Sequence, residues 1–256
     1  MDLEYFYEIG RIRSKQPQYQ AKKHKALDLI CEQLLTHDAP YLAISGGKDS
    51  VVMAFMVDEA ARTCGRDYRL WAHVSDASFP GTREIIKEVR DRLARPLDLD
   101  SNENAFKYAG FKKELRPFSK SGVFYDSIRE YAADKDLAFV GVRAWESKRR
   151  MKAAKIKGSY FHSKSMGDVD VCYPLLWYKV EDVAAATYEY EAPMHPIYGK
   201  CALDGKNKFG EDQWIRLGYI TSKDLLNKGT AVFLKINYPS IFNKLARSFP
   251  TIRQYT

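Results

Sequence analysis

The chain has 256 residues, of which 45% are hydrophobic, so it can bury a substantial core and its composition excludes a disordered protein. Its apolar runs fall short of the ~20 residues that span a bilayer, and its start lacks the basic-then-apolar pattern of a signal peptide. We therefore expect a cytoplasmic protein with no membrane partner. The net charge of +8 favours polyanionic partners such as nucleotides, nucleic acids or acidic proteins.

Helices and strands alternate in the predicted order of elements. Apolar residues at helical spacing predict a helix over residues 5–36, which Pro40 separates from a strand over 41–44. Further strands are predicted at 69–74, 96–99, 137–140 and 169–176. Further helices are predicted after residue 50, after residue 82, over 127–135, from 144, and over 181–190, with a loop at 157–168. This alternation predicts an α/β fold, with a mostly parallel sheet and helices on both faces.

The segment between the first strand and the next helix carries the clearest chemical signal. It consists of Ser45, Gly46, Gly47, Lys48, Asp49 and Ser50. Adjacent glycines allow positive φ angles and a close backbone approach to a ligand, and the first N–H groups of the helix favour an anion. The serine hydroxyls and the lysine add donors and positive charge. We predict a phosphate or pyrophosphate site, and the alternative is a glycine turn that only caps the helix.

Two other segments end predicted strands. Asp76 follows the strand at 69–74, and Gly141 and Arg143 follow the strand at 137–140. In parallel sheets, ligands bind beyond the carboxyl ends of the strands. We therefore expect these residues to meet the glycine-rich segment at one site.

Several motifs resemble those of one superfamily. The segment 45–50 resembles the pyrophosphate loop (PP-loop) of the N-type ATP pyrophosphatases and differs from the P-loop of kinases. The segments 76–82, 141–150, 173–183 and 195–198 resemble, in the same order, motifs of the phosphoadenosine phosphosulfate (PAPS) reductases. The resemblance covers residues from about 40 to 200. It implies an adenine-nucleotide α-hydrolase-like, Rossmann-like fold.

The resemblance also implies roles for charged residues. The residues of the loop would cradle the β,γ-pyrophosphate of ATP, and Lys48 and Asp49 would act in catalysis, with Asp49 orienting Mg²⁺. Arg143 would meet phosphate charge together with Arg149 or Arg150, because a guanidinium offers a fixed fork of donors. We assign Arg143 and Arg149 to catalysis and Arg150 to nucleotide binding.

Other residues of the motifs receive weaker assignments. Asp76 would contact a ribose or a metal-bound water, although an Asx turn explains it nearly as well. Gly141 joins the nucleotide-binding residues. We predict Trp145 and Trp177 as core residues rather than base-stacking ones, and His195 as a structural residue.

The resemblance fails at the cysteines. The reductases use a Glu-Cys-Gly-x-His segment near the C-terminus, whereas no cysteine follows Cys201 in this chain. The paired cysteines that hold an iron–sulfur cluster in relatives are also missing, so no such cluster is expected. The expected function is an ATP pyrophosphatase that cleaves ATP between its α and β phosphates and adenylates an acceptor for sulfur transfer.

The acceptor is not identified by the residues themselves. One branch of the superfamily activates the DNA backbone for phosphorothioation, with sulfur from a cysteine desulfurase, and the basic charge here is compatible with DNA. The first alternative is a sulfonucleotide reductase that uses Cys201 as its nucleophile. The second is a catalytically inactive nucleotide-binding module.

Three regions are predicted along the chain. An N-terminal helical segment covers residues 1–38, the nucleotide-binding α/β domain covers 39–200, and a C-terminal extension packed on that domain covers 201–256. The extension would serve as a dimer contact, a substrate-binding element or a lid. The resemblance allows a homodimer.

Overall fold

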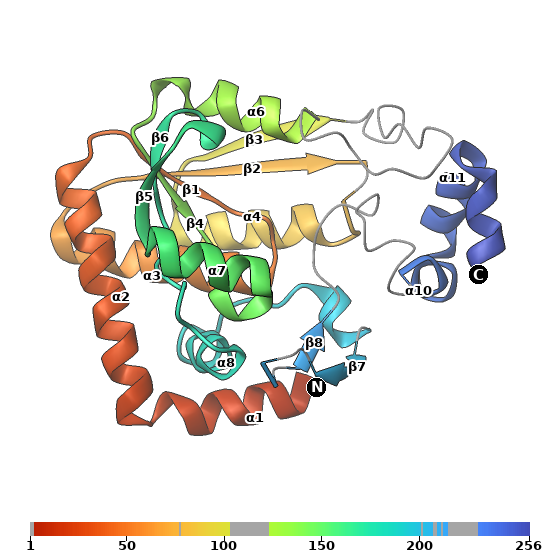
Figure 1. Cartoon of the computed structure of the whole chain (residues 1–256), viewed down its shortest axis with the longest axis horizontal. Helices are drawn as coiled ribbons and strands as arrows, with labels where there is room; N and C mark the ends of the chain where they lie inside the picture. Colours follow the sequence, from red (N-terminus) through yellow and green to blue (C-terminus); the bar gives the residue numbers. More distant parts are fainter. Residues whose placement is uncertain are drawn as a thin grey trace.

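A six-stranded sheet forms the centre of the computed structural model, which describes residues 3–76, 78–102, 123–200, 202–206, 209–210, 212–214 and 230–256 (Figure 1). The strands are β1 (Pro40–Ala43), β2 (Arg69–Ser75), β3 (Leu97–Asn102), β4 (Leu137–Val140), β5 (Tyr160–Ser163) and β6 (Val169–Cys172). Their order is β3-β2-β1-β4-β6-β5, and only β5 pairs in the antiparallel sense within this sheet. The predicted α/β class with a mostly parallel sheet is confirmed.

Helices connect and cover these strands. They are α1 (Leu3–Ser14), α2 (Pro17–Thr36), α3 (Lys48–Cys64), α4 (Thr82–Leu93), α6 (Val123–Tyr131), α7 (Lys148–Lys157), α8 (Val180–Glu189), α10 (Thr230–Asn237) and α11 (Pro239–Ser248). Short 3₁₀ turns include η2 (Ala144–Glu146), η4 (Pro196–Gly199) and η5 (Pro250–Tyr255), and β7 (Ala202–Lys206) pairs with β8 (Asp212–Trp214). In the described ranges, no helix has both the length and the hydropathy to cross a membrane.

Two predicted elements differ from the observed ones. The helix expected over residues 5–36 is two helices, because Pro17 lacks an N–H group and starts α2 at its first turn. The loop expected at 157–168 contains β5, a short edge strand with no clear alternation of buried and exposed side chains.

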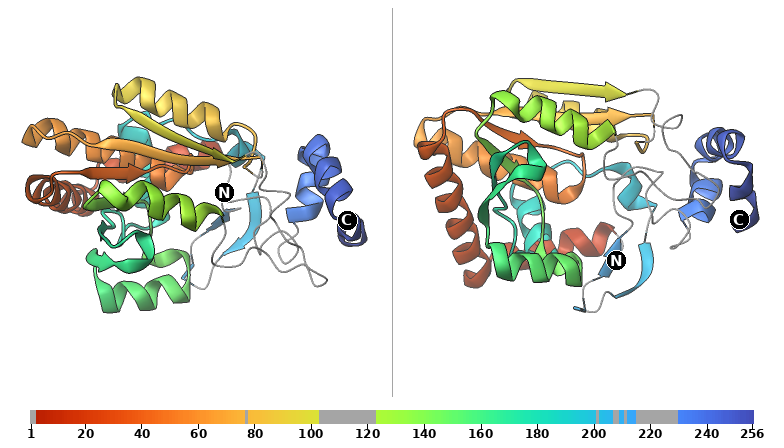
Figure 2. Two further views of the ribbon diagram at one scale, coloured as in Figure 1. Left: turned by 90° about the horizontal axis from the view of Figure 1, so that it is seen from above. Right: turned by 45° about the horizontal axis from the view of Figure 1, so that its top comes forward.

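Side chains alternate between the two faces of the sheet. Leu42 and Leu70 lie in the core shared with α2, α3, α4 and α8, whereas Tyr41 and Trp71 lie in the core shared with Ile128 of α6. Figure 2 shows the sheet between these two layers of helices. Because helices cover both faces of the sheet, a ligand can reach the sheet at the ends of its strands.

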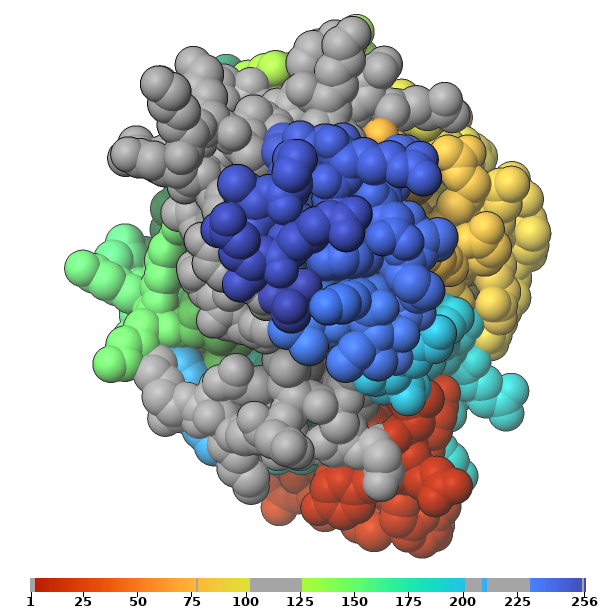
Figure 3. Space-filling view, turned by 90° about the vertical axis from the view of Figure 1, so that its right-hand side faces the viewer, coloured from red at the N-terminus to blue at the C-terminus, as the bar shows by residue number. Residues whose placement is uncertain are grey.

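The C-terminal helices pack at the carboxyl edge of the sheet, toward which β2 points in Figure 1. We call their apolar contact the C-terminal cluster. Its buried members are Phe79, Ile197, Tyr198, Ala231, Leu234, Phe242, Leu245, Ala246 and Ile252. Figure 3 shows α10, α11 and η5 in blue on this end of the molecule. The extension thus packs on loops that follow β2 and α8.

Candidate functional site

The loop between β1 and α3 is tightly folded. Gly46 has a φ of +74°, a conformation that side chains rarely adopt. The hydroxyl of Ser50 donates to the carbonyl oxygen of Gly47 at 2.9 Å and accepts from the amide of Ser45 at 3.2 Å. α3 begins at Lys48, so the first amides of this helix lie at the carboxyl end of β1, as the sequence predicts for an anion site.

Three charged residues meet at this loop. Asp49 accepts from the Lys48 ammonium at 2.6 Å through one carboxylate oxygen and from Nε of Arg143 at 2.6 Å through the other. Lys48 is 6% exposed and Arg143 is 4% exposed. Burial by itself would raise the pKa of Asp49, but the charges and hydrogen bonds of Lys48 and Arg143 outweigh it and hold that pKa well below its usual range. The Asp49 carboxyl therefore stays ionised at neutral pH.

Gly141 allows β4 to approach α3. A Cβ atom at this position would lie 2.9 Å from both the Cα and the amide nitrogen of Ser50. The close approach brings Arg143, two residues further on, to Asp49. Since β4 and β2 lie on opposite sides of β1, the loop occupies the point where the strand order reverses, which is the usual ligand position in such sheets.

The η4 turn closes over the start of α3. The hydroxyl of Tyr198 accepts from the backbone amide of Lys48 at 3.2 Å. His195 fixes this turn, because its Nδ1 accepts from the amide of Ile197 at 3.0 Å and its Nε2 therefore carries the proton toward Oγ1 of Thr82 at 3.1 Å. Burial lowers the pKa of His195 to about 4. These hydrogen bonds and the burial of His195 agree with its predicted structural role, which stays a prediction.

Asp76 lies at the end of β2 and faces the C-terminal helices. The ammonium of Lys244 on α11 is 3.6 Å from a carboxylate oxygen of Asp76. Sequence reasoning missed Lys244, since residues 201–256 carry no recognisable motif. It also gave Tyr198 no role, although Tyr198 stands in a recognised segment.

Comparison with protein families shows to which family the chain belongs. A family described as the phosphoadenosine phosphosulfate reductase domain matches residues 39–242, most of the chain. The chain belongs to this family. The match includes the loop, Asp76, Arg143 and Tyr198. A search of the curated proteins finds none that matches the sequence.

Solved structures share the fold of this PAPS reductase family member at low sequence identity. FMN adenylyltransferase from Candida glabrata, in complex with FMN and an ATP analogue, gives a TM-score of 0.55 at 13% identity, over 76% of this chain and 68% of that one. Yeast FAD synthetase gives 0.52 at 16% identity, over 79% and 72%. The U34-tRNA thiolase of Methanococcus maripaludis gives 0.50 at 13% identity, over 93% and 79%. These likenesses establish the α/β, Rossmann-like fold of the chain.

Not all predicted residues of the family motif gather at the triad. Arg149 lies exposed on α7, and Arg150 pairs with Glu146. Trp177 is 43% exposed, so its predicted core position is wrong. Trp145 is half-buried and donates from its indole nitrogen to the carbonyl oxygen of Trp177 at 3.4 Å. The family-derived roles of Arg149 in catalysis and of Arg150 in nucleotide binding stay predictions.

Two of the described cysteines, Cys31 and Cys172, do not have the character of nucleophiles. Burial raises the pKa of Cys31 to about 11 and also raises that of Cys172, so both thiols are protonated at neutral pH. Cys201, the candidate nucleophile of the reductase alternative, lies outside the described residues. Within the described part of the chain, no three His, Cys, Asp or Glu side chains form a metal-binding group.

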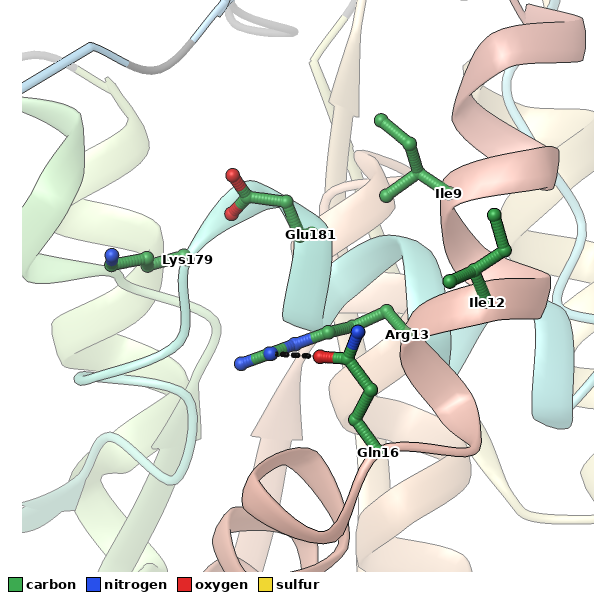
Figure 4. A pocket seen from close by; sticks show the side chains of 6 residues that line it. All are labelled: Ile9, Ile12, Arg13, Gln16, Lys179 and Glu181. Atoms are coloured by element: carbon green, nitrogen blue, oxygen red, sulfur yellow. Dashed lines mark hydrogen bonds between the residues drawn. The ribbon is translucent and has the colours of Figure 1, made fainter.

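An open pocket of about 310 Å³ lies between α1 and the start of α8 (Figure 4). It is lined by Ile9, Ile12, Arg13, Gln16, Lys179 and Glu181. Arg13 extends toward Gln16 across it and also donates to Asp182 at 2.8 Å. Since none of the residues of the loop 45–50 lines this pocket, the triad and not this pocket is the candidate site.

Proposed function

We propose that this protein binds ATP at the loop 45–50, cleaves it between the α and β phosphates and transfers the adenylyl group to an acceptor. The observation that carries the proposal is the buried meeting of Lys48, Asp49 and Arg143 beside the N-terminus of α3. A pyrophosphate group requires several positive groups and N–H donors in a small volume, and this site provides them. An acceptor oxygen would bond to the α phosphorus, any proton that it carries would pass to solvent, and pyrophosphate would leave.

In this mechanism the two cations exchange one anion for another. Lys48 and Arg143 are ion-paired with Asp49 in the structure, and a phosphate of greater charge can take over both contacts. Fixed cations then stabilise the negative charge that develops on the departing pyrophosphate. The step requires no general base from the protein.

Magnesium fits the donor set of this site. Proteins hold Mg²⁺ with one or two carboxylates together with phosphate oxygens of the substrate, and Asp49 supplies a carboxylate at the place where the phosphates would lie. When bound, the ion would neutralise phosphate charge. Asp49 would hold it once Lys48 and Arg143 turn to phosphate.

The direct test is product analysis. We expect AMP and pyrophosphate from ATP and magnesium, in the presence of candidate acceptors, and loss of both products in Lys48→Ala. A matched control is Lys87→Ala, which removes an exposed lysine on α4. ADP and phosphate as products, or unchanged release by Lys48→Ala, would contradict the proposal. ATP binding without any turnover would favour the inactive nucleotide-binding module.

The acceptor we propose is the DNA backbone, with sulfur delivered by a cysteine desulfurase or another donor. The support is α7, whose ten residues include Lys148, Arg149, Arg150, Lys152, Lys155 and Lys157 and no acidic residue. In the chain, α7 follows Arg143 and is separated from it by the short turn η2 and Ser147. A tRNA thiolase and an adenylyltransferase share the fold, so the fold is compatible with adenylyl transfer and with sulfur chemistry on a nucleic acid.

The alternative is a sulfonucleotide reductase with Cys201 as nucleophile. The family match favours this alternative. The protonated thiols of Cys31 and Cys172 argue against those two cysteines as the nucleophile, and Cys201 stays the proposed one. Sulfite release from PAPS or adenylylsulfate that disappears in Cys201→Ala would support this reading. Absence of sulfite from either compound would remove it.

A further inference from the structure

We propose that Tyr198 is a positioning residue whose hydroxyl oxygen stands in for a phosphate oxygen at the Lys48 amide, so that phosphate binding must displace it. The inference rests on the proposed use of the loop as a phosphate site. It assigns to Tyr198 control over the affinity of that site for pyrophosphate.

At the start of α3, the amide of Lys48 is bound by the side chain of Tyr198. Lys48 is the first residue of this helix, so its amide has no acceptor within the helix. Instead it donates to the hydroxyl oxygen of Tyr198 at 3.2 Å. The oxygen of Tyr198 therefore occupies the place along this N–H bond that an anion at the helix terminus would take.

The two cations of the site are likewise held by acceptors from the protein itself. The Lys48 ammonium and Nε of Arg143 are both engaged by Asp49 at 2.6 Å. Both the cations and the amide thus have partners supplied by the protein: a carboxylate for the charges and a neutral phenol for the amide. A phosphate oxygen is a stronger acceptor than a phenol, because hydrogen bonds to charged oxygens are roughly twice as strong as neutral ones.

Packing holds Tyr198 firmly in this position. It is 5% exposed and its ring belongs to the C-terminal cluster. The turn that carries it is fixed by the hydrogen bonds of His195 and by contact between Gly81 and Pro196, where a Cβ on Gly81 would lie 3.1 Å from Cδ of the proline. A phosphate must therefore displace the hydroxyl of a packed side chain, so this hydroxyl lowers the affinity of the loop for phosphate.

The test is pyrophosphate binding to Tyr198→Phe, measured by calorimetry on the whole chain with magnesium. Phenylalanine keeps the packed ring and removes the competing oxygen, so we expect binding about three- to tenfold tighter than in the wild-type protein, the effect of one neutral hydrogen bond. Tyr238→Phe is the matched control, because it makes the same chemical change in a side chain that packs against the same cluster. Its affinity should equal that of the wild type.

A second measurement reads the amide itself. With ¹⁵N-lysine labelling, the Lys48 amide resonance should shift when pyrophosphate is added to the wild type and should already differ in Tyr198→Phe. Unchanged or weaker binding in Tyr198→Phe would overturn the inference, and so would a Lys48 resonance that ignores pyrophosphate. Neither readout needs ATP turnover, so a failure of the proposed cleavage reaction is seen separately, in the product analysis.

Discussion

Asp49 has a structural task as well as its proposed chemical one, because it neutralises two buried cations. We predict that Asp49→Asn lowers the free energy of unfolding by about 3 kcal/mol, since removing one partner of a buried ion pair leaves the other charge uncompensated. Pyrophosphate should restore part of this loss, because it supplies negative charge to Lys48 and Arg143. Urea unfolding with and without pyrophosphate measures both effects.

The control for this prediction is Asp91→Asn. Asp91 pairs with Arg90 on the exposed side of α4, and surface substitutions of this kind change stability by about 0.5 kcal/mol or less. If Asp49→Asn were as stable as Asp91→Asn, the triad would contribute nothing to the fold.

His195 makes stability depend on pH. Its pKa is about 4 in the folded protein and 6.5 as the ordinary value, so between these values the unfolded chain binds more protons. The His195 contribution is therefore complete above pH 6.5 and is lost as the pH falls toward 4, with a magnitude on the order of 3 kcal/mol. We predict that His195→Asn flattens this part of the pH–stability curve, because asparagine can still accept from the Ile197 amide but does not titrate.

The control is His24→Asn, at an exposed position of α2. Chemical unfolding between pH 4 and 7 compares the three proteins. Identical slopes for wild type and His195→Asn would mean that the buried imidazole does not govern this range.

At the scale of elements, the contact between β4 and α3 sets the site. We predict that Gly141→Ala costs about 1–3 kcal/mol of stability, a typical cost of overpacking, and weakens pyrophosphate binding at least tenfold. The new Cβ would lie 2.9 Å from backbone atoms of Ser50, so α3 has to shift and separate Arg143 from Asp49. Gly199→Ala is the control, because there, among the described residues, a Cβ would meet the side chain of Leu3 at 3.4 Å and no other atom within 4 Å. Equal affinity in both variants would show that the close approach is unimportant.

Some elements and some site residues could be predicted from the sequence, and others could not. Apolar periodicity identified α3, α4 and the central strands, because they lie in the two main cores. Chain order placed the loop, Asp76 and Arg143 at one edge, since the ends of parallel strands meet there. The contacts of Tyr198 and Lys244 could not be predicted, because they depend on packing between segments distant in the sequence. The exposure of Trp177 could not be predicted either, since a tryptophan next to a strand is usually buried.

At the scale of the whole molecule, the excess of positive charge is concentrated on one helix. We predict that the triple variant Lys148→Glu/Lys152→Glu/Lys155→Glu loses DNA binding and shows a smaller salt dependence, because each phosphate contact contributes about 0.9 to the slope of log affinity against log salt. All three lysines are exposed on α7. Fluorescence anisotropy at several salt concentrations measures both quantities.

The control variant carries the same change of charge on other helices, at the exposed Lys25, Lys87 and Lys235. If the two triple variants bound DNA equally well, attraction by net charge alone would explain the binding. If the wild type bound no DNA, the proposed acceptor would be wrong.

The C-terminal cluster bears on how the protein is made. The carboxyl end of the sheet joins Phe79 and Tyr198 to Leu234, Phe242 and Ile252, so a nascent chain can form the sheet before it can complete this end. Until α10 and α11 have left the ribosome, Phe79, Ile197 and Tyr198 lack their apolar partners, and exposed surface of this kind promotes aggregation of folding intermediates. Residues up to η5 must therefore be synthesised before the candidate site reaches its final form.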